Sequence, residues 1–184
     1  MSLVHVILGL LQQQERTGYD LKTKCFDDCI AHLWPADQAQ IYRTLDKLES
    51  QGLITCIVEI QHDRPNRKVY RITAAGEAEL THWLQTHQPL PMLREPLLAQ
   101  LYFAAQLPNE AIAYLLEQEL EARQAKLAQC EAIDAISLSN PTASREQELH
   151  RLVLDLVKQR EQTYLDWLEQ AIRAMHTLRD RHNP

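Results

Sequence analysis

The N-terminal part of the chain places apolar side chains at the three- and four-residue spacing of amphipathic helices. One apolar face predicts a helix that ends before Thr17, and its members are Leu3, Ile7, Leu10 and Leu11. Thr17 and Asp20 match a capping box, in which each residue satisfies a backbone N–H of the other. We therefore expect a second helix to begin at Thr17 and to stop at Trp34-Pro35.

A second capping box follows at once and predicts a third helix. Asp37 would cap it, Gln40 would complete the box, and Gly52 would end it. Its inward side chains are expected to be Ile41, Leu45 and Leu48. The first part of the chain is thus expected to pack as three short helices.

After Gly52 the pattern changes to β-branched and apolar residues over 53–60 and again over 69–73, which predicts two strands. Asp63, Pro65 and Asn66 lie between them and favour a turn, so we expect a β-hairpin. A fourth helix should follow at Thr73. Three helices, a hairpin and a helix, in that order, are typical of a winged helix-turn-helix domain.

Beyond a proline cluster that ends at Pro96, the pattern predicts helices alone, over residues 97–106, 109–136 and 144–181. Ser144 and Gln147 form a third capping box. The last two helices are expected to pair antiparallel along an apolar seam. That seam would use Ile112, Leu116, Leu120, Leu127 and Cys130 on one helix and Leu149, Leu152, Leu156, Tyr164, Trp167, Ala171 and Met175 on the other. Because two helices cannot cover all of this apolar surface, we expect a second copy of the chain to do so.

These elements predict a mainly α protein with two domains. The winged helix-turn-helix domain would span residues 1–87, and an all-α coiled dimerisation domain, which would also receive an effector, would span residues 97–181. The chain has 184 residues, of which 45% are hydrophobic and 24% charged, as in globular proteins with a packed core. No apolar run approaches the ~20 residues that cross a bilayer. We therefore expect a cytoplasmic protein with no membrane partner.

The formal net charge of the chain is −6, so contact with a polyanion requires a local basic patch. Two neighbouring segments provide one, the outer face of the third helix and the hairpin. Their candidate contacts with double-stranded DNA are Gln38, Gln40, Tyr42, Arg43, Lys47, Arg64, Arg67 and Lys68. The alternative for each segment alone is a solvated surface.

Three motifs in these segments carry a resemblance. They are TGYDL over 17–21, WPADQAQIYRTLDKLESQGLI over 34–54 and RPNRKVYRITAAGEAEL over 64–80. Together they resemble the PadR family of bacterial transcriptional regulators. The resemblance implies a repressor that binds a palindromic operator as a homodimer through a winged helix. It also implies that Tyr42, Arg64, Arg67 and Lys68 contact DNA and that Tyr19 braces the second helix near the DNA backbone.

One function class outside DNA binding stays open at this point, a homodimeric protein-interaction module that kept the fold without binding DNA. The repressor itself is expected to be released by a hydrophobic or aromatic small-molecule effector, for which the candidate residues are Trp34, Tyr102, Phe103 and Trp167. The alternative for these aromatic residues is a dimer core.

Cys25, Cys29 and His32 would share one helix face and so form a candidate redox or soft-metal site. Two buried cysteines and a surface histidine are the simpler interpretation. The chain contains no HExxH, G-x-S-x-G or glycine-rich phosphate motif. We therefore expect no enzyme, no cofactor and no metal.

Overall fold

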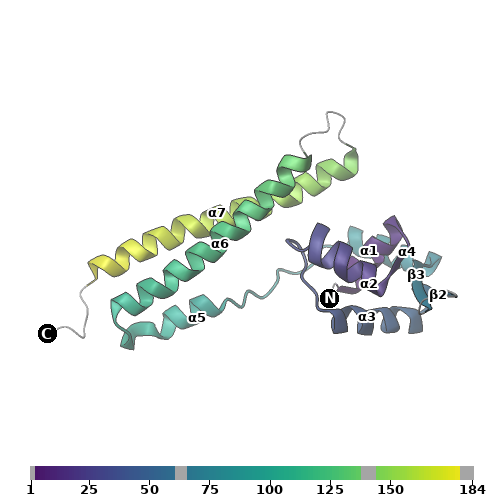
Figure 1. Ribbon diagram of the computed structural model, residues 1–184, viewed down its shortest axis with the longest axis horizontal. Helices are drawn as coiled ribbons and strands as arrows, with labels where there is room; N and C mark the ends of the chain where they lie inside the picture. The colour runs from purple at the N-terminus through teal and green to yellow at the C-terminus, as the bar shows by residue number, and fades with distance from the viewer. Residues whose placement is uncertain (1–2, 61–65, 138–143, 179–184) are drawn as a thin grey trace. The chain divides into compact units, whose positions relative to one another are not determined.

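The computed structural model describes residues 3–60, 66–137 and 144–178, with side chains described up to residue 133 in the second of these ranges (Figure 1). The chain divides into two units, Met1–Pro91 and Met92–Pro184. The first unit contains α1 (Leu3–Gln13), β1 (Arg16–Thr17), α2 (Gly18–Asp20), the π-helix η1 (Leu21–Cys29), α3 (Gln38–Ser50), β2 (Ile54–Glu59), β3 (Arg67–Ile72) and α4 (Ala74–Gln85). The second contains α5 (Pro96–Phe103), the 3-10 helix η2 (Ala104–Gln106), α6 (Asn109–Ser137) and α7 (Arg145–Thr177). A mainly helical winged-helix protein is confirmed.

The predicted helix starts are confirmed by their capping geometry. Reciprocal side-chain caps form at Thr17 with Asp20, at Asp37 with Gln40 and at Ser144 with Gln147. Gly52 ends the third helix with a φ of 70°, a left-handed conformation that glycine adopts without strain. These local signals work because each satisfies backbone groups that the helix itself leaves unpaired.

The second helix differs from its prediction. It begins at Gly18, but its larger part is a π-helix that ends at Cys29, well before Trp34-Pro35. The wide turn is closed by the N–H of Ile30, which donates to the carbonyl of Cys25 (3.0 Å). His32 therefore lies in a turn and not on the helix face predicted for it.

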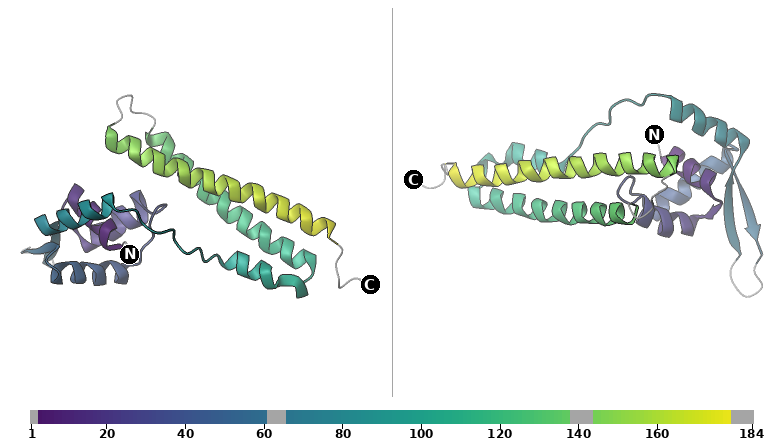
Figure 2. Two further views of the ribbon diagram at one scale, coloured as in Figure 1. Left: turned by 180° about the vertical axis from the view of Figure 1, so that it is seen from behind. Right: turned by 90° about the horizontal axis from the view of Figure 1, so that it is seen from above.

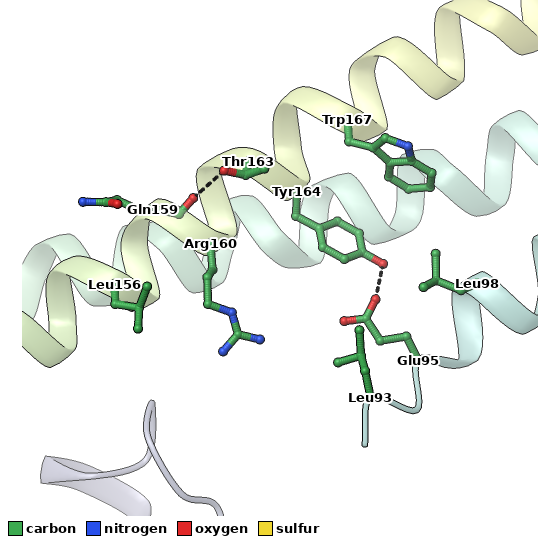
Figure 3. Close-up of a pocket in the computed structure, with 9 residues that line it drawn as sticks. All are labelled: Leu93, Glu95, Leu98, Leu156, Gln159, Arg160, Thr163, Tyr164 and Trp167. Atoms are coloured by element: carbon green, nitrogen blue, oxygen red, sulfur yellow. Dashed lines mark hydrogen bonds between the residues drawn. The ribbon is translucent and has the colours of Figure 1, made fainter. Parts of the chain in front are cut away.

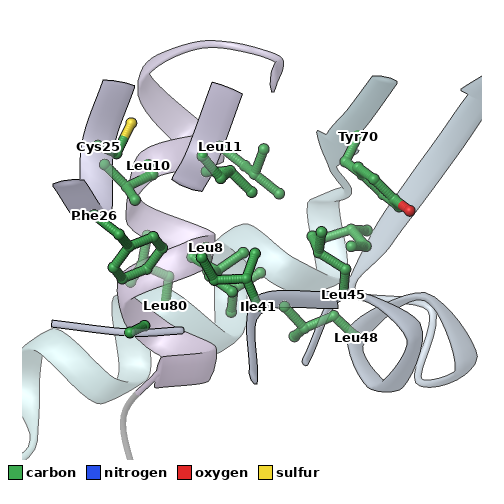
Figure 4. Packing of buried hydrophobic residues seen from close by; sticks show 14 residues of the cluster. Leu8, Leu10, Leu11, Cys25, Phe26, Ile41, Leu45, Leu48, Tyr70 and Leu80 are labelled. Atoms are coloured by element: carbon green, nitrogen blue, oxygen red, sulfur yellow. The ribbon is translucent and has the colours of Figure 1, made fainter. Parts of the chain in front are cut away.

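The core of the first unit lies between α1, η1, α3 and the hairpin (Figure 4). The inward prediction for the third helix is confirmed, because Ile41, Leu45 and Leu48 are completely buried. β2 and β3 pair antiparallel from Ile54 opposite Ile72 to Glu59 opposite Arg67, which confirms the hairpin (Figure 2). The short strand β1 was not predicted; it pairs with β3 on the other side and gives the strand order β1-β3-β2.

In the second unit α6 and α7 pack side by side along most of their length (Figures 1 and 2). The predicted seam on α7 is wrong for three leucines, since Leu149, Leu152 and Leu156 are more than half exposed. The predicted Tyr164, Ala171 and Met175 do pack against the core of the second unit. The prediction omitted the stripe of buried positions on α7, which are Leu154, Glu161, Leu165 and Leu168.

A charged cluster explains why this stripe escaped the apolar pattern. Glu161 occupies a core position and is only 4% exposed. Arg123 donates to its carboxylate at 2.9 Å, and Lys126 pairs with the other oxygen. Burial acts to raise the pKa of Glu161, but hydrogen bonds from Lys126 and Arg123 outweigh that effect, and the pKa is lowered. The ionised carboxylate thus fixes the register of the two helices from inside their contact.

The helices of the described part of the chain include none that is both long enough and apolar enough to cross a bilayer.

Candidate nucleic-acid interface and ligand cavity

The outer face of α3 carries four of the predicted DNA contacts, and all four are exposed. They are Gln38, Gln40, Arg43 and Lys47. Gln40 also completes the helix cap, since its side-chain oxygen accepts from the N–H of Asp37 (3.2 Å). The amide nitrogen of Gln40 remains available as a donor. The cap thereby holds this side chain at the start of the helix, where it can reach a base edge.

A hollow of about 710 Å³ runs along the same face. It is lined by Leu3, Leu33, Trp34, Pro35, Gln40, Arg43, Thr44 and Lys47. Trp34, one of the predicted effector residues, therefore lies beside the start of the third helix in the first unit.

Tyr42 leans across the start of the second helix. Its side chain is 37% exposed, and an added Cβ on Gly18 would lie 2.6 Å from a carbon of the tyrosine ring. The ring can only take this place because position 18 has no side chain. Tyr19, which follows Gly18 in the chain, is 66% exposed. The structure thus brings the two tyrosines of the resemblance to neighbouring positions.

Of the three basic residues predicted to contact DNA from the hairpin, Arg67 and Lys68 belong to the described residues, and Arg64 lies outside them. Lys68 is exposed on β3, opposite Val58. Arg67 is not free, because its guanidinium donates to the carboxylate of Asp20 at 2.8 Å; the Arg67 side chain as a whole is 47% exposed. Asp20 therefore ties the hairpin to the second helix, a role that the sequence does not reveal because the two residues are 47 positions apart.

Asp20 is buried and receives several hydrogen bonds. The hydroxyl of Thr17 donates at 2.6 Å, and the ammonium of Lys24 lies at 2.8 Å. The hydrogen bond from Lys24, followed by that from Thr17, holds the pKa of Asp20 well below its usual range, against the opposing effect of burial. The carboxylate is consequently ionised at any pH at which the protein would act.

Asp20→Asn is expected to destabilise the protein by about 1–3 kcal/mol at pH 7, since it removes charge-assisted hydrogen bonds from a buried site. The pKa of Asp20 is depressed in the folded state, so its stabilising effect is present above the unfolded pKa of about 3.9 and is lost as the pH falls towards the folded value. Urea denaturation of both proteins should therefore show a gap at pH 7 that narrows at pH 3. An equal gap at both pH values would contradict the ion-pair role.

The second unit contains a cavity of about 570 Å³ between α7 and the chain that leads into α5 (Figure 3). Its lining is mostly apolar and aromatic. The residues are Leu93, Glu95, Leu98, Leu156, Gln159, Arg160, Thr163, Tyr164 and Trp167. Tyr164 and Trp167 meet edge to face, with ring centroids 5.6 Å apart.

Three polar side chains of this lining, Tyr164, Glu95 and Arg160, set its chemistry. The hydroxyl of Tyr164 donates to the carboxylate of Glu95 at 2.7 Å (Figure 3). Burial, followed by this carboxylate, raises the pKa of Tyr164 to about 12, so its hydroxyl keeps its proton. Arg160 makes no ion pair with any residue in the part of the chain that the structure describes. A cavity with apolar walls and an unpaired cation suits a small organic anion.

Of the predicted effector residues in the second unit, only one lines this cavity. Trp167 lines the cavity, whereas Tyr102 and Phe103 lie outside its lining and are 82% and 72% exposed. Trp34 belongs to the first unit. Sequence patterns did not predict Glu95 or Arg160 beside Tyr164, because Glu95 comes from a segment far from α7 in the chain and Arg160 carries no local signal of a pocket.

The thiols of the second helix differ sharply in exposure. Cys25 is completely buried in the core, and Cys29 is exposed. Burial, followed by the neighbouring Cys29, raises the pKa of Cys25 to about 11, which keeps the thiol protonated. The residues that the structure describes contain no cluster of three potential metal ligands.

Both units of the chain are similar to known protein families. Residues 7–82 match the transcriptional regulator PadR-like family, and residues 93–176 match the C-terminal domain of virulence activator alpha. The negative transcriptional regulator PadR of Bacillus subtilis is 34% identical over 176 residues, which cover 91% of this chain and 93% of that protein. The chain belongs to the PadR-like family of transcriptional regulators.

The PadR-like fold extends over both units. A crystal structure of Bacillus subtilis PadR in complex with operator DNA matches with a TM-score of 0.81 at 32% identity, covering 95% of this chain and 99% of that one. A crystal structure of the same PadR in complex with p-coumaric acid matches with a TM-score of 0.77 at 31% identity, covering 95% and 98%. The likeness thus includes the helical second unit, which the three sequence motifs did not cover.

Proposed function

We propose that this PadR-like protein is a repressor that binds a palindromic DNA operator as a homodimer and releases it when a small aromatic acid binds. The first unit is the DNA-binding domain, and the second joins two chains and holds the ligand. The proposal includes no catalytic step. A protein with this function would act in the cytoplasm, where its operator lies.

The observation that carries the proposal is the exposed face of α3. Its cap fixes Gln38 and Gln40 at the N-terminal end of the helix, and Arg43 and Lys47 follow on the same side. A recognition helix contacts base edges with its N-terminal residues, and cations further along neutralise phosphates. The complex of Bacillus subtilis PadR with operator DNA supports this assignment.

The hairpin adds contacts beside this helix. Lys68 is available for a phosphate, while Arg67 offers only the part of its guanidinium that Asp20 does not hold. A twofold dimer places two such domains on DNA, so half-sites should lie about 10 base pairs apart or at a multiple of that distance. Exposed Leu149, Leu152 and Leu156 on α7 supply apolar surface for the second chain.

The cavity in the second unit is the proposed ligand site. Its volume lies within the ~300–1,000 Å³ of small-molecule sites, and it combines aromatic walls with Arg160, which has no ion-pair partner among the described residues. Aromatic carboxylic acids match both features. The complex of Bacillus subtilis PadR with p-coumaric acid supports an acid of this class.

The decisive experiment is binding of the purified protein to a fluorescent duplex from the region upstream of its own gene. We expect affinity to fall roughly 10³-fold between 50 and 200 mM salt, because Arg43, Lys47 and Lys68 of two chains would release counterions from about six phosphates. Fluorescence anisotropy at several salt concentrations measures this. Absence of binding at 50 mM salt would favour a protein-interaction module instead.

A further inference from the structure

The position of Glu95 within the ligand cavity points to a role beyond lining it. Glu95 directly precedes α5 and occupies its N-cap position, yet its side chain makes no capping hydrogen bond. Its carboxylate instead accepts from Tyr164 on α7 and lies 3.9 Å from the guanidinium of Arg123 on α6. The residue therefore joins the start of α5 to both long helices through one carboxylate.

Arg123 holds three carboxylates, and Glu95 is the most weakly held of them. The guanidinium lies 2.7 Å from Glu119 and 2.9 Å from Glu161, compared with 3.9 Å from Glu95. Glu161 has a side chain only 5% exposed, whereas that of Glu95 is 20% exposed and faces the cavity. Glu95 is thus the carboxylate that lies farthest from Arg123 and the one of the three that lines the cavity.

The surroundings of the Glu95 carboxylate are those that would recognise the acid group of a ligand. Tyr164 supplies a hydroxyl donor, Arg123 supplies a positive charge above the tyrosine ring, and Trp167 and Leu98 form apolar walls beside them. Arg160 is the cation in the lining of the cavity itself, whereas Arg123 lies behind Glu95 and Tyr164, outside that lining. An aromatic acid that enters must therefore contend with a carboxylate that is already in place.

We propose that Glu95 is an internal competitor for the acid group of the ligand. An aromatic carboxylate displaces the Glu95 side chain from Tyr164 and Arg123 and takes these contacts itself. Because Glu95 directly precedes α5, the exchange frees the start of that helix and so transmits occupancy to the chain between the two units. This inference rests on the ligand site of the proposed function and adds the residue that sets its affinity and its preference for acids.

The test uses Glu95→Gln, which keeps an acceptor for the hydroxyl of Tyr164 but removes the competing charge. Isothermal titration calorimetry with p-coumaric acid and with its neutral amide gives the acid-to-amide affinity ratio of each protein. We expect Glu95→Gln to bind the acid about tenfold more tightly than the unmodified protein and the amide with an affinity within about twofold. Glu119→Gln, which removes a partner of Arg123 outside the cavity, should change the affinity for the acid less than threefold.

Each other outcome overturns the proposal. Equal tightening of acid and amide would mean a packing effect, an unchanged affinity for the acid would mean no competition, and absence of binding to either protein would mean no acid site. The operator duplex is titrated with the same preparations. A protein that binds DNA but shows no change in the acid-to-amide ratio rejects the competitor alone, whereas failure to bind DNA rejects the repressor function.

Discussion

Arg43→Glu combined with Lys68→Glu is expected to weaken binding to operator DNA at least about 100-fold at 100 mM salt. Each substitution removes an attraction to a phosphate and adds a repulsion, once in each chain of the dimer. Arg43 lies on the exposed face of α3 and Lys68 on the wing strand β3, so the pair tests both elements together. Fluorescence anisotropy with the operator duplex measures the loss.

Arg67 is less suitable for this test than Arg43 and Lys68, because it forms an ion pair with Asp20. Arg67→Glu would place a carboxylate against the carboxylate of Asp20 and damage the fold, so its effect on DNA binding would be ambiguous. Arg43 and Lys68 take part in no ion pair among the residues that the structure describes. Their replacement should leave the melting temperature within about 2 °C, because exposed substitutions of this kind change stability by only about 0.5 kcal/mol.

A matched control separates a local contact from a general change of charge. Arg94→Glu with Arg145→Glu lowers the formal net charge by the same amount at exposed positions of the second unit. We expect this control to weaken DNA binding less than fivefold. Equal losses in the two double variants would show that overall charge, and not the winged helix, governs the affinity.

The sequence predicted the elements of the winged helix well because their signals are local. The capping boxes at Thr17, Asp37 and Ser144 fix helix starts within four residues of chain, and each is present in the structure. The buried face of α3 follows from spacing alone. What local signals did not show was the π-helix at Leu21–Cys29, because its wide turn is closed by backbone hydrogen bonds and not by particular side chains.

The candidate sites also divide into one that local spacing predicts and others that only the packing of distant segments forms. The face of α3 was predictable because neighbouring turns of one helix must expose it. The partner of Arg67 and the lining of the cavity were not, since Asp20 with Arg67, and Glu95 with Tyr164, are brought together only by packing. Glu161 shows the same limit: a glutamate at a core position looks like a surface residue until Arg123 and Lys126 are seen beside it.

The largest effect on stability is expected from Gly76→Ala, a single added methyl group in the first turn of α4. An added Cβ would lie 2.1 Å from the carbonyl oxygen of Leu53, far inside van der Waals contact. That oxygen also accepts from the N–H of Thr73 at 3.0 Å, and Thr73 caps Gly76 in turn. Since backbone blocks the methyl group, the helix must move, and we expect a loss of about 2–4 kcal/mol in the free energy of unfolding, measured by urea denaturation.

Gly9→Ala supplies the opposite case within the same unit. Gly9 lies inside α1, and an added Cβ there would meet nothing within 4 Å. Alanine is the better helix former, so this variant should gain about 0.5–1 kcal/mol. Both variants must be compared at one protein concentration, because the proposed dimer would make the apparent stability depend on concentration. Equal changes in stability at the two positions would contradict the close approach at Leu53. Changes of opposite sign would show that steric contact with Leu53 limits the side chain at the junction between β3 and α4.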